Sequence, residues 1–182
     1  PTACGSLVWA SLCFDPVNDE AVLFGGGMAL NLWGGAYTWL YDCEENTWRP
    51  LDQPRKEQPP LRCNVQTAFD TKSRCIVLFG GDTQSTRLAD TWIYDAKTRR
   101  WAERQPELSP PPVASCGMTY VASQGLIVMC GGDDQTWTYD VAVNKWTRIK
   151  GGLDLDRRKD NPGWSTGFVS CAYSPKEDLT LL

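Results

Sequence analysis

The sequence predicts an all-β protein in which one four-stranded unit is repeated along the chain. Three observations support this: two short motifs recur with constant internal spacing, the copies follow one another about every 50 residues, and short apolar runs alternate with polar turns. Repeats of this length stack, because a single unit cannot bury its own apolar faces. We therefore expect three complete units and the start of a fourth within the 182 residues.

The first motif begins with an aromatic residue and ends in a pair of glycines. The residue before the glycines lies ten positions after the leading aromatic in every copy. The copies are Phe14 to Phe24-Gly25-Gly26, Phe69 to Phe79-Gly80-Gly81, and Tyr120 to Cys130-Gly131-Gly132. Each contains a polar turn and then an apolar run at 21–24, 76–79 or 127–130, which predicts a β-hairpin whose second strand is buried on both faces. The glycines indicate that the backbone needs freedom where that strand ends.

The second motif is Thr-Trp-x-Tyr-Asp, with a further Trp seven residues after the Tyr. Its aromatic residues are Trp39, Tyr41 and Trp48; Trp92, Tyr94 and Trp101; and Trp137, Tyr139 and Trp146. The first Trp and the Tyr lie two residues apart, so they project to the same face of a strand and are expected to pack between units. The Asp can accept hydrogen bonds from amides of the following turn. Asn46 and Asn144 suit the left-handed position of that turn, whereas Arg99 fits it less well.

Together the two motifs predict four strands in each unit, here called A, B, C and D. The units span about 4–51, 61–104 and 112–149, and Tyr173 opens a fourth at about 165–182. The glycine pair of this fourth copy would fall beyond Leu182, so we expect the chain to stop inside the unit.

These motifs, including the Val-Leu-Phe-Gly-Gly sequence at 22–26, resemble the kelch repeat, and the resemblance covers nearly the whole chain. It implies a kelch-type β-propeller segment in which each unit is one blade and strand A is innermost. Propellers close with about four to eight blades. The segment is therefore not closed within this chain, and the remaining blades are expected in the same chain or from another chain. Cys130 and Val121 depart from the pattern, where an aromatic residue and an Asp are expected.

The two ends of the predicted blades differ in their loops. Strand directions alternate, so the A–B and C–D turns emerge at one end and the B–C and D–A connections at the other. The turns are constant in length, whereas from the second Gly to the strand-C Trp the interval is 13, 11 and 5 residues. Variable loops commonly carry binding residues. Candidate binding residues at this end are Asn31, Trp33, Arg55, Arg62, Asp82, Gln84, Arg87, Asp133, Asp134 and Arg157.

Several of these residues also have a structural interpretation. Asp82 and Asp133 directly follow glycine pairs, which favours Asx-turns over metal binding. Trp33 is typical of a residue that covers a loop's own small core. Arg157 lies in a basic run flanked by acidic residues, which is typical of a solvated loop.

The resemblance implies a non-catalytic binding or scaffolding module that holds a protein or glycan partner with the variable loops. One alternative is a fragment of a propeller-bearing enzyme, such as a galactose-oxidase-like copper oxidase, with its active site outside this segment. Another is a structural subunit of a larger assembly. The chain has no histidine, the usual copper ligand and general base, so we predict no catalytic, cofactor-binding or metal-binding residue in it.

Composition narrows the partners further. A net charge of −4 argues against nucleic acid, and no apolar run approaches the length that spans a membrane. The eight cysteines are compatible with two interpretations: most are buried free thiols, or at least one disulfide is present. They point towards an extracellular or cell-envelope location, with an intracellular adaptor as the alternative.

Overall fold

The computed structural model describes residues 7–28, 38–83, 85–131, 135–149 and 170–181, and these residues form antiparallel β-sheets. The first sheet comprises β1 (Leu7–Asp15), β2 (Glu20–Met28), β3 (Thr38–Asp42) and β4 (Thr47–Pro50), and the 3-10 helix η1 (Arg55–Glu57) follows it. The second comprises β5 (Gln66–Asp70), β6 (Cys75–Phe79), β7 (Thr91–Asp95) and β8 (Arg100–Arg104). The third comprises β9 (Gly117–Val121), β10 (Leu126–Cys130), β11 (Thr136–Asp140) and β12 (Lys145–Ile149), and a two-stranded sheet follows with β13 (Ala172–Ser174) and β14 (Leu179–Leu181).

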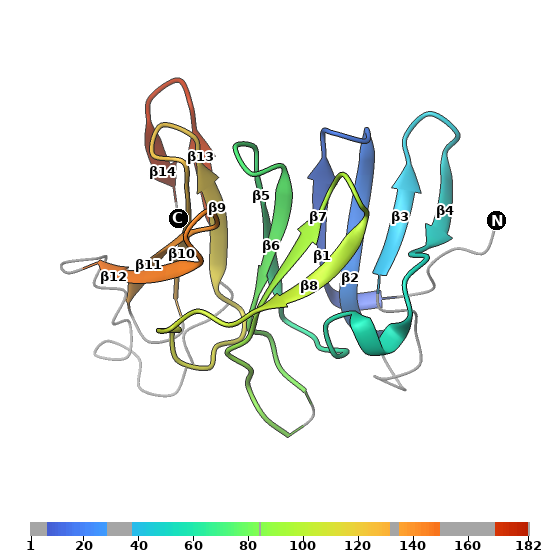
Figure 1. The fold of residues 1–182 in the computed structure, drawn as a ribbon, viewed down its shortest axis with the longest axis horizontal. Helices are drawn as coiled ribbons and strands as arrows, with labels where there is room; N and C mark the ends of the chain where they lie inside the picture. Colours follow the sequence, from blue (N-terminus) through green and yellow to red (C-terminus); the bar gives the residue numbers. More distant parts are fainter. Residues whose placement is uncertain (1–6, 29–37, 84, 132–134, 150–169, 182) are drawn as a thin grey trace.

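The three four-stranded sheets follow one another in chain order from right to left in Figure 1, and β13 and β14 lie at the upper left, above β10–β12. Within each four-stranded sheet, consecutive strands pair with one another. The first strands of successive sheets are in contact, β1 with β5, β5 with β9, and β9 with β13. The sheets formed by the described residues do not close into a ring. The predicted fold class, three four-stranded blades and the start of a fourth, is therefore confirmed.

The second blade is the only described blade with a four-stranded neighbour on each side, and its burial reflects this. All five residues of β6 are buried, as predicted for a strand covered on both faces. In β2 and β10, burial alternates over the apolar runs, and Leu23 and Val128 are only half-buried. Two-sided burial is thus confirmed for β6 and wrong for β2 and β10, because one face of each has less covering it.

The closing Trp of each later blade packs against the preceding blade. The ring centroids of Trp101 and Phe24 are 5.5 Å apart, and those of Trp146 and Phe79 are 4.8 Å apart. Each indole nitrogen also donates to the threonine that begins strand C of the preceding blade, at 3.0 Å in both cases. These two phenylalanine–tryptophan contacts therefore join neighbouring blades, and the indoles of Trp101 and Trp146 are buried with their polar groups satisfied.

The glycine pairs lie where the chain enters the next blade. Gly25, Gly26, Gly80, Gly81 and Gly131 all have positive φ. The amide of Gly26 donates to the carbonyl of Arg62 at 2.9 Å, and the amide of Gly81 donates to that of Val113 at 2.8 Å. A Cβ on Gly25 or Gly80 would lie 2.5 Å from the same carbonyl oxygens. Glycine is therefore required both by the left-handed backbone and by the close approach of the connection that enters the next blade.

The C–D turns are capped as the sequence predicts. Asp42, Asp95 and Asp140 each accept at least one hydrogen bond from an amide of the following turn. Asn46, Arg99 and Asn144 all have a φ near +53°. Asparagine adopts this conformation more readily than arginine does, so the turn of the second blade is the least suited of the three to its backbone.

Arg99 also changes the environment of the tyrosine beneath it. Tyr139 donates a hydrogen bond of 2.7 Å to the Asn144 side chain, and Tyr41 donates one to Asn46. Arg99 instead binds Glu20 of the first blade, with 2.9 Å between Nε and Oε1. The Tyr94 hydroxyl is consequently buried with no hydrogen-bond partner in the described structure.

Tyr94→Phe and Tyr139→Phe should therefore have opposite effects on stability. We expect Tyr94→Phe to raise the free energy of unfolding by about 1 kcal/mol, because it removes a buried polar group that has no partner. We expect Tyr139→Phe to lower it by about 1 kcal/mol, because the bond to Asn144 is lost. Urea unfolding of the intact protein measures both. Equal losses in the two variants would contradict the assignment.

Candidate binding surface

The turns and the longer connections emerge at opposite ends of the blades. The hairpin turns stand along the upper edge of Figure 1, and the longer connections run along the lower edge. We call the lower edge the loop end and the upper edge the turn end. The antiparallel order of the strands requires this separation, because each strand returns the chain to the end from which it came.

Two of the predicted residues are exposed at the loop end. Arg55 lies in η1, in the connection between the first and second blades. Arg87 lies in the B–C connection of the second blade, beside the exposed residues Ser85 and Thr86. Their guanidinium groups suit carboxylates, phosphates and aromatic faces of a ligand.

Two buried glutamines hold the connection that contains Arg55. The Gln53 side chain accepts from the Trp101 amide at 2.7 Å and donates to the Trp101 carbonyl at 3.0 Å, so it binds β8 as a neighbouring strand would. Gln58 donates to the Gln53 carbonyl and accepts from the Thr38 hydroxyl. The connection is therefore anchored to both blades, which positions η1 at the loop end.

Asp82 takes part in a backbone bridge. Its amide and carbonyl both pair with those of Cys63, at 2.9 Å each, and its carboxylate accepts from the Asn64 side chain at 3.1 Å. The residue is half-buried. Its observed contacts are structural, but among the described residues the carboxylate accepts from Asn64 and not from an amide of the expected Asx-turn.

The prediction that Arg62 belongs to the binding surface is wrong. Its side chain is fully buried and forms a two-pronged ion pair with Asp90. It also donates to the carbonyls of Pro60 and Gly80. A buried guanidinium needs such partners, since an unpaired buried charge is strongly destabilising. The sequence pattern did not show that Arg62 would be buried in an ion pair with Asp90, which lies in the connection between β6 and β7.

Asp90 is held in its charged form by this pair. Burial alone raises the pKa of the carboxyl group, but the hydrogen bonds and charge of Arg62, with a hydrogen bond from the Trp92 indole, outweigh burial and bring the pKa below its usual value. The pair therefore connects the entry to the second blade with the start of its strand C.

Three residues that the sequence analysis missed lie where strand A begins. Trp9, Asn64 and Ser115 each have a φ between +52° and +60°. The amide of Asn64 donates to the Trp9 carbonyl at 3.0 Å, and the amide of Ser115 donates to the Asn64 carbonyl at 2.9 Å. This row of hydrogen bonds runs from blade to blade at the loop end. Trp9 is 50% exposed, so an indole lies on this surface.

Trp9, Asn64 and Ser115 share a position that the spacing could have revealed. Each lies five residues before the leading aromatic of strand A, which is Phe14, Phe69 or Tyr120. The residue types differ, however, so no motif marked the position. A left-handed Trp or Ser is uncommon without tertiary contacts that require it.

The remaining predicted residues lie outside the described part of the chain. They are Asn31, Trp33, Gln84, Asp133, Asp134 and Arg157, together with Gly132 of the third glycine pair. Their place in the binding surface stays a prediction.

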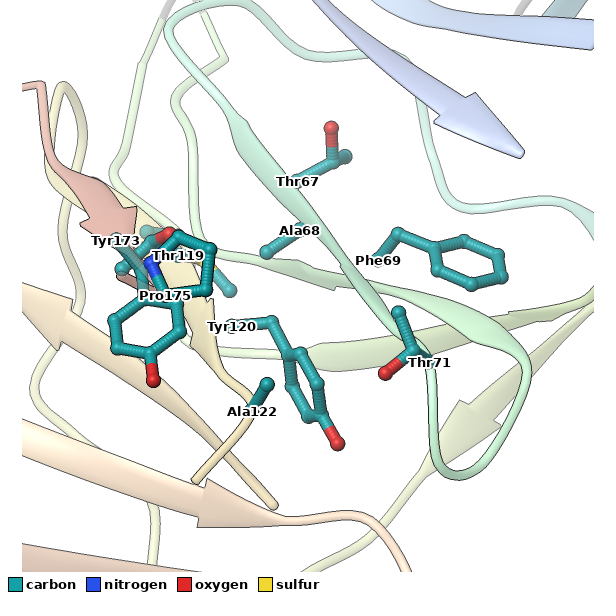
Figure 2. Close-up of a pocket in the computed structure, with 10 residues that line it drawn as sticks. Thr67, Ala68, Phe69, Thr71, Thr119, Tyr120, Ala122, Tyr173 and Pro175 are labelled. Carbon is teal, nitrogen blue, oxygen red and sulfur yellow. The ribbon is translucent and has the colours of Figure 1, made fainter. Parts of the chain in front are cut away.

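A pocket of about 430 Å³ lies between the first strands of the second, third and fourth blades. Its wall includes Thr71, Tyr120 and Tyr173, and Figure 2 shows Tyr120 between the other two, with the ring of Phe69 directed away from them. Thr71, Ala122 and Pro175 belong to or adjoin A–B turns, so the pocket opens towards the turn end. It offers hydroxyl groups and aromatic rings but no charged side chain.

The repeat pattern matches a described family. Residues 3–170 match the model of the KLHDC2/KLHL20/DRC7 Kelch-repeats domain. The chain belongs to the kelch-repeat family. It is also similar to the serine/threonine-protein phosphatase BSL2 of Arabidopsis thaliana, with 35% identity over 63 residues. That match covers 34% of this chain and only 6% of the phosphatase, so the chain spans a small part of that protein.

Within residues 7–28, 38–83, 85–131, 135–149 and 170–181, no group of three histidine, cysteine or acidic side chains is arranged to hold a metal ion. Over the same residues, no helix is long and apolar enough to cross a membrane. The exposed residues at the loop end include Trp9, Arg55, Lys56, Glu57, Thr86 and Arg87. Indole and guanidinium groups suit recognition of a protein surface.

Proposed function

We propose that this kelch domain is a non-catalytic binding module whose loop end holds a protein partner. The observation that favours this end is the contrast between the two edges of the blades. The turn end repeats the same four-residue turns, whereas the loop end differs from blade to blade in length and in side chains. A rigid scaffold with variable loops at one end is the usual arrangement for recognition.

The exposed residues support a protein as the partner. Tryptophan and arginine are the residue types most enriched where binding energy concentrates in protein interfaces. Trp9, Arg55 and Arg87 are exposed at the loop end. The indole of Trp9 also suits a sugar ring, so a glycan is the alternative partner.

Two loop-end variants with a turn-end control test the proposal. Arg87→Glu reverses one charge, and Trp9→Asn removes the indole while placing asparagine where the second blade has Asn64 with the same backbone conformation. Lys97→Glu reverses an exposed charge in the C–D turn of the same blade as Arg87. We expect each loop-end variant to weaken partner binding by roughly tenfold or more, and Lys97→Glu to leave it within about twofold.

The measurement begins with affinity capture by the intact protein, followed by titration calorimetry with the partner that is identified. Binding that Lys97→Glu weakens as much as Arg87→Glu would contradict use of the loop end. A glycan array detects the alternative ligand class. Copper in the intact protein, or substrate turnover, would favour the enzyme alternative, and a fixed stoichiometric complex insensitive to both loop-end variants would favour a structural subunit.

A further inference from the structure

At the junction between the third and fourth blades, a cysteine stands where the two earlier junctions have a phenylalanine. In the first two blades, the residue before the glycine pair is a phenylalanine, which packs against the Trp of the next blade. In the third blade this residue is Cys130, at the end of β10. Cys130 is 2% exposed, so the fold places a buried thiol on the face that meets the fourth blade.

The fourth blade supplies a second thiol from the opposite side. Cys171 lies two residues before Tyr173, and its counterpart Met118 lies two residues before Tyr120. Met118 is buried against the second blade in the same cluster as Phe79. The repeat therefore predicts that Cys171 faces the third blade just as Met118 faces the second, and that it lies near Cys130, since Met118 shares a core cluster with Phe79.

The atomic contacts agree with this pairing. The Cys130 and Cys171 side chains are both free thiols, and they lie close enough for each to shift the pKa of the other. Gly117 is the strand partner of Cys130, and a Cβ on Gly117 would lie 3.0 Å from both the backbone nitrogen and the Sγ of Cys171. The missing side chain at Gly117 thus makes the space in which Cys171 reaches Cys130.

We propose that Cys130 and Cys171 are a disulfide-forming pair that joins the third and fourth blades under oxidising conditions. The oxidant is a low-molecular-weight disulfide. The sulfur of the half-exposed Cys171, after losing its proton, attacks one sulfur of this disulfide. The S–S bond of the oxidant breaks, one molecule of thiol leaves with the proton, and a mixed disulfide forms on Cys171. The Cys130 thiolate then attacks the Cys171 sulfur and expels the second thiol. Two cysteine thiols lose two protons and two electrons, and the oxidant is reduced to two thiols.

Accessibility sets this order of steps, because Cys171 is half-exposed whereas Cys130 is buried. The Cys171 side chain lowers the pKa of Cys130, although burial opposes it, so Cys130 is the better source of thiolate. The Cys130 side chain and burial raise the pKa of Cys171. The neighbouring Cys116 is buried, and burial raises its pKa to about 12, which keeps it a protonated thiol at neutral pH.

The direct test is to map the disulfide in the intact protein. The purified protein is equilibrated with glutathione buffers from fully reduced to fully oxidised, free thiols are alkylated, and the non-reduced digest is sequenced by mass spectrometry. We expect the peptide containing Cys130 to be linked to the peptide containing Cys171 in oxidised buffer, and the link to disappear on reduction. Free, alkylated Cys130 and Cys171 at the oxidised end of the series would overturn the proposal.

Single variants identify the sulfur atoms that form the bond. Cys130→Ser and Cys171→Ser should each abolish the link, whereas Cys116→Ser, which removes the neighbouring buried thiol, should leave it unchanged. The Cys116→Ser control matters because Cys116 and Cys130 fall in the same tryptic peptide. A link that survives Cys130→Ser but not Cys116→Ser would assign the bond to the wrong thiol and refute the pair.

A stability measurement tests whether the bond joins the blades. Oxidation should raise the Tm of the intact wild-type protein by roughly 5 °C or more, since the bond closes a loop of the unfolded chain. The Tm of the Cys130→Ser/Cys171→Ser double variant should not change between the two buffers. An equal rise in the double variant would show that the stabilisation has another origin.

Discussion

Arg62→Met is expected to lower the free energy of unfolding by about 3–5 kcal/mol, because it leaves a partly buried carboxylate without its counter-ion. The Arg62 side chain is fully buried, and Asp90 is bound to it through both carboxylate oxygens. The variant also removes the donors to the carbonyls of Pro60 and Gly80. Urea unfolding of the intact protein gives the change.

A matched exposed arginine separates this effect from the loss of any arginine. Arg87 belongs to the same blade and is exposed, and Arg87→Met should change the free energy of unfolding by less than about 0.5 kcal/mol. A double-mutant cycle with Asp90→Asn measures the coupling of the pair. If Arg62→Met cost no more than Arg87→Met, the ion pair would have no part in stability.

The same pair makes stability depend on pH in a defined direction. The pKa of Asp90 is lower in the folded protein than its usual value. Burial raises this pKa, and the hydrogen bond and charge of Arg62 lower it by more. The stabilisation is therefore present in full above the ordinary carboxyl pKa of about 3.9 and is lost as pH falls through the folded-state value. Wild-type stability should accordingly fall more steeply below about pH 4 than that of Asp90→Asn.

Gly80→Ala is expected to cost about 3 kcal/mol or more, the second large effect. At a φ of +65°, an L-residue is strained by about 1–2 kcal/mol. The new Cβ would also lie 2.5 Å from the Val113 carbonyl oxygen, which belongs to the backbone of the connection leading into the third blade. That backbone can move only by breaking the hydrogen bond from Gly81 to the same carbonyl.

Gly125→Ala provides the control for the backbone strain alone. Gly125 has a φ of +66°, but the nearest atom to a new Cβ is the Cδ of Lys72 at 3.3 Å, part of a flexible, exposed side chain. We expect a loss of about 1–2 kcal/mol, from strain only. Similar losses in the two variants would show that this connection yields easily and that conformation alone requires the glycine at 80.

The fold was predictable because the same motifs, with the same internal spacing, occur three times in the sequence. An apolar run between a polar turn and a glycine pair marks strand B, and the constant spacing of Tyr41 to Trp48 and its equivalents marks the hairpin of strands C and D. The turn positions were predictable too, since Asp42 and Asn46 serve the turn from within a few residues. Local interactions of this kind can be read from spacing.

The binding surface was less predictable, because its residues are placed by contacts with other blades. Arg62 and Arg87 look alike in the sequence, as basic residues in variable connections. One is buried and the other exposed, and only the position of Asp90 decides which. Trp9 carries no motif, and the pocket beside Tyr120 is formed by three strands that lie about 50 residues apart in the sequence.

The sequence by itself determined the architecture, the strand order, the turn conformations and the family, since each follows from residues that are close together or regularly spaced. The tertiary structure alone decided which side chains remain exposed, which charges pair, why Gly80 allows no side chain, and that Cys130 meets Cys171. These features depend on contacts between one blade and the next. A periodic sequence pattern specifies the strands of each blade, but it does not specify which atoms of the neighbouring blade they contact.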